Sequence, residues 1–190
     1  MREEAAGEEK TRPLFSGRAV AVLGITALVA VLVDQLVKHL STEGLTEGEP
    51  VRILGGLVYL SLLRNSGAAF SLGSGYTWVF PLVTLLVIGW IGWMGTRLRS
   101  VPWALALGLV LGGALGNLGD RLFRAPGVFQ GHVVDMISLF GPYAQYFAVF
   151  NIADACLSVG VVLAVLLELT GRQRDGSRPA PKNKKQESES

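Results

Sequence analysis

The sequence predicts an all-α polytopic membrane protein with four transmembrane helices and a small β-rich extracytoplasmic element between helices 1 and 2. Half of the 190 residues are hydrophobic and only 17% are charged, a composition typical of membrane proteins. The hydrophobic residues gather in four long segments, and most basic residues lie on one side of these segments. These observations together argue against a soluble globular domain.

Each hydrophobic segment approaches the ~20 residues that a helix needs to cross a hydrocarbon core of ~30 Å. Helices are expected because backbone groups in lipid need hydrogen-bond partners within their own segment. The flanking stretches are too polar to bury a core and are predicted to be disordered cytoplasmic tails. The segments are residues 19–40, 76–94, 101–118 and 146–169, within a domain of 19–171 between tails of 1–18 and 172–190.

The basic residues orient the segments. They precede the first segment, fill the link between the second and third, and follow the fourth, so the positive-inside rule places both termini in the cytoplasm. The connections 41–75 and 119–145 then face outward. No signal-peptide cleavage site follows the first segment, which is therefore expected to be retained. These basic residues are Lys10, Arg12, Arg18, Arg97, Arg99, Arg172, Arg174, Arg178, Lys182, Lys184 and Lys185.

The remaining composition excludes several classes of function. The single cysteine, Cys156, excludes an internal disulfide framework. Two histidines and the lack of an HExxH motif argue against a zinc site, and no nucleic-acid signature occurs. Neither a metal nor another cofactor is expected.

In the first outer connection, residues 51–54 and 57–63 have β-type composition around Gly55 and Gly56, which predicts a hairpin on the outer membrane surface.

Two aspartates stand in apolar surroundings near the same predicted membrane boundary. Asp135 lies in the second outer connection, and Asp154 follows Tyr146 by eight residues, which places it roughly 12 Å into the fourth helix. A carboxylate at membrane depth costs several kcal/mol unless something holds it there, so a functional role is the default interpretation. Two neighbouring carboxylates that share one proton are the arrangement that activates water in aspartic proteases.

Other polar residues fall in the same outer half of the segments. Asn151 and Asp154 are three residues apart and share a helical face, as do Asn117 and Asp120. Glycines beside them are expected to permit close helix packing, namely Gly112, Gly113, Gly116 and Gly119. The pattern predicts a polar pocket between helices that opens toward the outer leaflet. Its candidate supporting residues are Asp34, Asn65, Asn117, Asp120, Arg121 and Asn151.

Each of these residues also has a structural alternative. Asp120 and Arg121 can form an interfacial ion pair, and Asp34 can cap or bind backbone donors at the outer end of the first helix. Asn65 can satisfy backbone groups of its loop, and Asp135 can be a solvated loop residue. These alternatives remain open at the level of sequence.

Lys38 is expected to extend its ammonium to the membrane interface, and Cys156 is expected to be a packing residue rather than a nucleophile.

Two other classes of function remain open on the residues alone. One is an ion- or proton-coupled transporter with Asp34, Asp120 and Asp154 as relay groups. The inner halves of the segments lack ionisable residues to continue such a path. The other is a membrane assembly factor with a structural polar core.

The sequence contains five ordered blocks: DQLVK at 34–38, RNSGAAF at 64–70, GALGNLGDR at 113–121, GHVVD at 131–135 and FNIAD at 150–154. Together they closely resemble the motifs of bacterial lipoprotein signal peptidase, also called signal peptidase II. The resemblance implies a membrane aspartyl endopeptidase that cleaves diacylglyceryl-modified prolipoproteins just before the lipidated cysteine. It runs from about residue 19 to residue 169 and covers all four segments.

The resemblance assigns the catalytic dyad to Asp135 and Asp154, with the six candidate residues above in supporting roles. It implies prolipoprotein signal peptides and membrane lipid as partners, globomycin-type cyclic peptides as inhibitors, and a monomer. The expected location is the bacterial plasma (inner) membrane, with the active site on the extracytoplasmic side. One departure is the connection 122–131, which is longer than is common in the family but leaves both aspartates in place.

Overall fold

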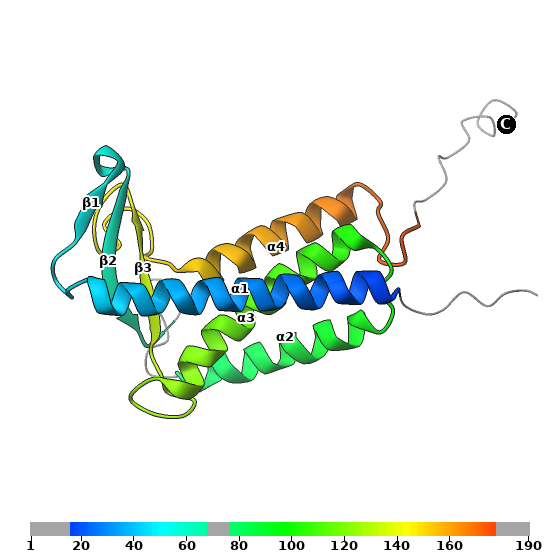
Figure 1. The fold of residues 1–190 in the computed structure, drawn as a ribbon, viewed down its shortest axis with the longest axis horizontal. Helices are drawn as coiled ribbons and strands as arrows, with labels where there is room; N and C mark the ends of the chain where they lie inside the picture. Colours follow the sequence, from blue (N-terminus) through cyan, green and yellow to red (C-terminus); the bar gives the residue numbers. More distant parts are fainter. Residues whose placement is uncertain (1–15, 68–76, 178–190) are drawn as a thin grey trace, which may run out of the picture.

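A computed structural model of the chain describes residues 16–67 and 77–177. Within these residues four helices run along a common direction, and a three-stranded sheet lies at one end of them (Figure 1). This arrangement confirms the predicted fold class. The elements are α1 (Gly17–Gly44), β1 (Val51–Ile53), the 3-10 turn η1 (Leu54–Gly56), β2 (Val58–Asn65), α2 (Val79–Gly95), α3 (Val101–Phe123), β3 (Val133–Leu139) and α4 (Ile152–Leu169).

Three of the helices, α1, α3 and α4, are long and apolar enough to cross a membrane. The fourth, α2, has 17 residues and is a shorter apolar helix. Large apolar side chains such as Leu32, Leu86 and Val162 are more than half exposed along these helices. Such exposure suits surroundings of lipid, because lipid tails solvate apolar side chains as well as a protein core does.

Helix α3 lies at the centre of the bundle and packs against α1, α2 and α4. Its glycines allow this packing: a Cβ on Gly112 would lie 2.5 Å from Ala30 Cβ, and one on Gly113 would collide with the Ala153 carbonyl oxygen. Gly116 is equally restricted, whereas Gly119 has its nearest neighbour at 3.9 Å. The predicted role in close packing is therefore confirmed for three glycines and wrong for Gly119.

The sheet contains the predicted hairpin and one strand that was not expected. β1 and β2 form the hairpin and pair antiparallel, with Val51 opposite Leu60. The other edge of β2 pairs antiparallel with β3, with Asn65 opposite Val133. The register shifts between Leu60 and Leu63, where β2 bulges. β3 contains Asp135, so the sheet carries one of the two aspartates to the ends of the helices.

The last helix begins later than predicted, at Ile152 rather than near Tyr146. The residues from Tyr146 to Asn151 are not helical, and Phe150 pairs with Ile137 beside the sheet. The expectation that Asp154 lies roughly 12 Å into a helix is therefore wrong, because Asp154 stands in the first turn of α4. The prediction placed the start of the helix too early because the aromatic residues before Ile152 suit the edge of a sheet as well as a helix.

The chain after α4 folds back on the bundle where the structure describes it. The Arg174 carbonyl accepts hydrogen bonds from the N–H groups of Arg99 and Ser100, and Trp103 Nε1 donates to the Arg172 carbonyl. The segment 172–177 thus packs on the link between α2 and α3. The rest of the two predicted tails, and residues 68–76 with the start of the second predicted segment, lie outside the described residues.

Candidate active site

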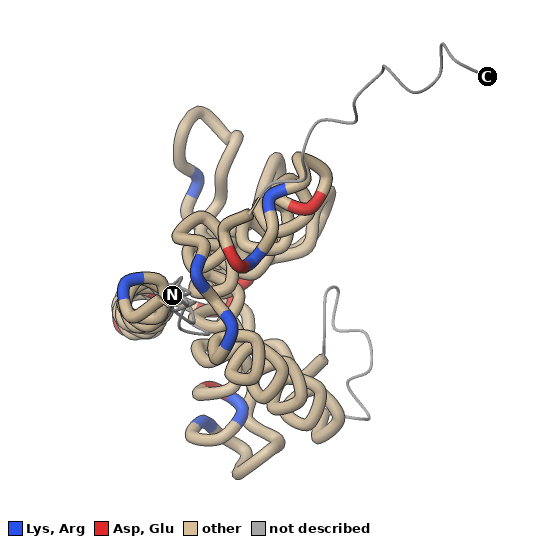
Figure 2. The backbone as a smooth tube through the Cα atoms, turned by 90° about the vertical axis from the view of Figure 1, so that its right-hand side faces the viewer, with Lys and Arg blue, Asp and Glu red and all other residues tan. Residues whose placement is uncertain are grey.

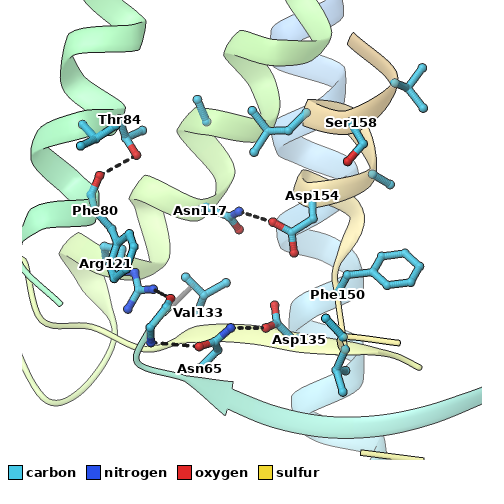
Figure 3. Close-up of a pocket in the computed structure, with 18 of the residues that line it drawn as sticks. Asn65, Phe80, Thr84, Asn117, Arg121, Val133, Asp135, Phe150, Asp154 and Ser158 are labelled. Atoms are coloured by element: carbon cyan, nitrogen blue, oxygen red, sulfur yellow. Dashed lines mark hydrogen bonds between the residues drawn. The ribbon is translucent and has the colours of Figure 1, made fainter. Parts of the chain in front are cut away.

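A cavity of about 710 Å³ lies between the sheet and helices α2, α3 and α4, and both aspartates line it (Figure 3). Asp135 reaches it from β3 and Asp154 from the first turn of α4. The remaining walls combine apolar side chains with a few polar groups, a composition typical of ligand pockets. The polar lining residues are Asn65, Thr84, Asn117, Arg121, Asp135, Asp154 and Ser158.

Asn151 joins the two aspartates. It is the N-cap of α4: its Oδ1 accepts from the Asp154 N–H at 2.9 Å, and its own N–H donates to Asp154 Oδ2 at 3.2 Å, a reciprocal capping box. Its Nδ2 donates to Asp135 Oδ1 at 2.7 Å. One buried side chain therefore starts the helix that carries Asp154 and also positions Asp135.

Each aspartate has a second amide partner. Asn65 Nδ2 donates to Asp135 Oδ2 at 2.9 Å, and Asn117 Nδ2 donates to Asp154 Oδ1 at 2.7 Å. Asn65 Oδ1 also accepts a hydrogen bond from the Gly67 N–H at 2.9 Å. Asn65 therefore stabilises its own loop, as the structural alternative expected, and also lines the pocket. Both carboxylates are thus fixed by neutral donors, which orient them without adding charge.

Lys38 lies fully buried beneath this pair, so the expectation that it reaches the membrane interface is wrong. Its Nζ is 2.8 Å from Asp34 Oδ2, 2.8 Å from Asp120 Oδ2 and 3.0 Å from Asn117 Oδ1. Two carboxylates and an amide thus satisfy all three donors of the ammonium. Burial is tolerated because the charge is fully paired.

Asp120 and Arg121 do not pair with each other, so that structural alternative is wrong. Asp120 forms its ion pairs with Lys38 and, through Oδ1 at 2.6 Å, with Arg124 Nε. The guanidinium of Arg121 donates instead to the carbonyl oxygens of Gly131 and Gly67 and lies over the Phe80 ring at 5.3 Å. Arg121 therefore ties two connections together beside the pocket.

Asp34 binds a backbone donor, as one alternative expected, but the donor belongs to another helix. Its Oδ1 accepts the Ala153 N–H at 2.9 Å, one of the unpaired donors in the first turn of α4. Gln35 Nε2 donates to Asp34 Oδ2 and to the Gly116 carbonyl, each at 3.1 Å. This end of α1 is therefore bonded to both α3 and α4.

Asp135 is only 1% exposed, which excludes the alternative of a solvated loop residue. The pKa of its carboxyl is raised from 3.8 to about 7, mainly by burial and also by the nearby charge of Asp154. Hydrogen bonds from Asn65 and Asn151 and the charge of Lys38 oppose this shift in pKa. A carboxyl with such a pKa can hold or release a proton near neutrality.

Five of the eight predicted site residues line the pocket. The other three, Asp34, Asp120 and Asn151, do not line it but join the same network, Asn151 through its bond to Asp135 and the two aspartates through Lys38. Lys38, Gln35 and Arg124 also belong to this network, although none of them was a predicted site residue. The spacing of Asp34 and Lys38 was a usable signal, because residues four apart on a helix are neighbours. Within residues 16–67 and 77–177, no group of three His, Cys, Asp or Glu side chains is arranged to hold a metal ion.

Comparison with known proteins gives consistent matches. The family model described as "Signal peptidase (SPase) II" matches residues 26–170. Proteins named lipoprotein signal peptidase are similar over most of the chain. That of Streptomyces coelicolor is 46% identical over 169 residues (89% of this chain, 79% of the relative), and that of Leifsonia xyli is 45% identical over 168 residues (88% and 76%). That of Mycobacterium tuberculosis is 44% identical over 169 residues (89% and 81%).

Two solved structures have the same fold, and both are bacterial membrane enzymes determined by the in meso method. The structure at 2.3 Å resolution has a TM-score of 0.69 and 25% identity, covering 87% of this chain and 95% of that one. The structure at 1.9 Å resolution has a TM-score of 0.65 and 28% identity, covering 80% and 93%. With a family match over most of its length and relatives above 40% identity, the chain belongs to the signal peptidase II family.

Proposed function

We propose that this protein is a membrane aspartyl endopeptidase that removes signal peptides from diacylglyceryl-modified prolipoproteins, cutting just before the lipidated cysteine. Family membership supports the peptidase activity, and the names of the relatives support the substrate class. The observation that carries the aspartyl mechanism is the pair formed by Asp135 and Asp154. Both line one pocket, and Asn151 bonds to both.

In the proposed mechanism the pair shares one proton, which Asp135 holds, and Asp154 is ionised. Asp154 takes a proton from a bound water, and the resulting hydroxide attacks the scissile carbonyl carbon. Asp135 donates its proton to the carbonyl oxygen, which gives a neutral diol. Collapse of the diol breaks the C–N bond as Asp154 gives its proton to the leaving amine and Asp135 takes one from a diol hydroxyl. These two transfers restore the starting state of the dyad, and no covalent enzyme intermediate forms. The raised pKa of Asp135 supports its role as the proton donor.

The pocket suits a substrate that arrives within the membrane. Its walls on α2 and α4 are apolar, as at Val83, Val87 and Leu157, while the aspartates lie at the sheet end of the cavity (Figure 3). An apolar signal helix can enter sideways between these walls, and the acyl chains can stay in the surrounding lipid. A globomycin-type cyclic peptide is expected to compete for the same pocket, as the resemblance implies.

We place the pocket on the extracytoplasmic side of the bacterial plasma membrane, with both termini in the cytoplasm. Figure 2 views the protein from the end opposite the sheet, where the first turn of α1, the link between α2 and α3, and the end of α4 lie. Basic residues gather in these segments, which supports a cytoplasmic position under the positive-inside rule. They include Arg18, Arg97, Arg99, Arg172 and Arg174.

The test is cleavage of a synthetic diacylglyceryl-modified prolipoprotein peptide by the purified full chain in lipid, with a chelator present. The wild-type protein is expected to cut before the lipidated cysteine. Asp135→Asn and Asp154→Asn should each lower turnover by roughly 10²–10⁴-fold, because each removes a group that transfers a proton. Asp175→Asn is the matched control, since Asp175 is exposed and lies after α4.

Retained turnover in the Asp154→Asn protein would contradict the dyad mechanism. A folded wild-type protein that does not cut the substrate would overturn the peptidase proposal and favour the transporter or assembly-factor interpretations. Cleavage at a position other than the lipidated cysteine would leave the peptidase activity and overturn the proposed specificity.

A further inference from the structure

The charges around the pocket do not balance when every group is ionised. Four carboxylates, those of Asp34, Asp120, Asp135 and Asp154, face three cations. The cations are Lys38, Arg121 and Arg124. One negative charge is therefore in excess, and a single added proton makes the cluster neutral. This is the protonation state that the proposed mechanism requires of the dyad.

Lys38 has the central position among the three cations. It is fully buried and bonds to Asp34, Asp120 and Asn117 at once. Arg124, by contrast, is partly exposed, and the hydrogen bonds of Arg121 go to backbone carbonyls. Loss of the Lys38 charge would therefore leave two buried carboxylates with much less compensation.

Lys38 also determines which end of the Asn117 amide meets the dyad. An ammonium has only donors, so Asn117 must turn its Oδ1 toward Lys38, at 3.0 Å. The Nδ2 of Asn117 then faces Asp154 Oδ1 at 2.7 Å, and the same Oδ1 accepts from Asn151 Nδ2 at 3.2 Å. A chain of bonds thus runs from Lys38 through two amides to both aspartates.

We propose that Lys38 is a positioning residue for the cleavage reaction, which orients Asn117 toward Asp154 and supplies the charge that leaves the dyad with one proton. This inference rests on the proposed dyad mechanism. Without Lys38, four carboxylates face two cations, and neutrality requires two protons instead of one. A dyad that takes up the second proton has no base to activate water.

The charged groups that face Asp135 set the direction of the expected pH effect. They are Asp154 from α4, Lys38 from α1 and Arg121 from α3. Lys38 lowers the pKa of Asp135, so removing this cation favours protons on the dyad as a whole, including a second proton on the proposed base Asp154. The protein without this cation should therefore lose activity at neutral pH and recover it at higher pH, where the second proton leaves.

The experiment measures kcat against pH for the wild-type protein, Lys38→Met and the double variant Asp34→Asn/Lys38→Met. The single variant is expected to lose at least about tenfold in turnover at pH 7 and to shift its pH profile upward by about one unit or more. The double variant removes one charge of each sign. Its pH profile should return toward that of the wild type, even where its maximal rate is lower.

Thermal unfolding of each variant distinguishes loss of charge from loss of fold. A folded Lys38→Met protein with the wild-type pH profile would overturn the proposal. If the single variant does not fold, the double variant decides: a wild-type profile supports the charge role, and an upward shift contradicts it. Activity in Asp154→Asn would instead reject the dyad itself, so the two failures are distinguishable.

Discussion

Among single residues, Asn151 links local helix chemistry to the site. Its side chain caps α4 and donates to Asp135, while its backbone N–H donates to Asp154. Asn and Ser both make good N-caps, because each offers a side-chain oxygen to the first free N–H groups. Only Asn adds the Nδ2 donor that reaches Asp135. The capping and positioning roles of this residue can therefore be separated by substitution.

Asn151→Ser should keep the cap but lose the bond to Asp135. Both Asn151→Ser and Asn151→Ala lose the buried Nδ2 bonds to Asp135 and Asn117. We expect Asn151→Ala to be less stable than Asn151→Ser by about 1 kcal/mol, because only the alanine variant also lacks the cap. Both variants should cleave much more slowly, because Asp135 loses the partner that orients it. Unfolding in detergent and cleavage assays check the two effects, and wild-type turnover in Asn151→Ser would contradict the positioning role.

The raised pKa of Asp135 predicts a pH dependence with a definite sign. The folded protein keeps this proton up to a pH of about 7, whereas the unfolded chain releases it near 3.8. The associated stability is fully present below pH 3.8 and is lost as the pH rises through about 7. Turnover should fall over the same upper range, because the proton donor is lost. Unfolding measured at pH 5 and pH 8 checks this, and Asp135→Asn should remove this contribution.

The two aspartates of the proposed dyad could be singled out from sequence because charges are costly within apolar segments. The role of Lys38 could not, because its partner Asp120 lies on another helix and no local pattern encodes that contact. A lone lysine near a helix end usually extends to water. Here two carboxylates from different helices hold it inside, and only the fold brings them together.

At the scale of elements, the helices were predictable and the third strand was not. Long apolar runs identify membrane helices, although the 146–169 run also included residues that precede α4. β3 pairs with β2, about 70 residues earlier in the chain, and is largely buried, so it lacks the alternation of a half-exposed strand. Its position at the site follows from sheet register rather than from any local signal.

The glycines of α3 allow a matched test of helix packing. Gly113→Ala would place a methyl group against the Ala153 carbonyl, next to the first turn that carries Asp154. We expect destabilisation of about 1–3 kcal/mol and slower cleavage, because overpacking displaces α4. Gly119→Ala is the control, since its methyl group would meet nothing closer than 3.9 Å. Equal behaviour of the two variants in unfolding experiments would contradict this account.

At the scale of the whole molecule, the sheet and the basic helix ends lie at opposite ends of the bundle (Figures 1 and 2). The proposed topology places Glu49, in the connection before β1, outside the cell and Ser177 inside. In a Cys156→Ala background, Glu49→Cys should react with a membrane-impermeant maleimide in intact cells. Ser177→Cys should react only after the membrane is permeabilised. The reverse labelling pattern would invert the topology and place the pocket in the cytoplasm.

The ion pair between Asp34 and Lys38 has a consequence for biosynthesis. α1 is made first, and it enters the membrane before the ribosome has synthesised Asp120, Asn117 or the first turn of α4. Two lone charges would oppose that insertion, but these are four residues apart on one helix and lie 2.8 Å from each other. They can neutralise each other in the nascent helix until the later helices arrive. The polar centre of the enzyme therefore begins as a self-contained pair that the rest of the chain assembles around.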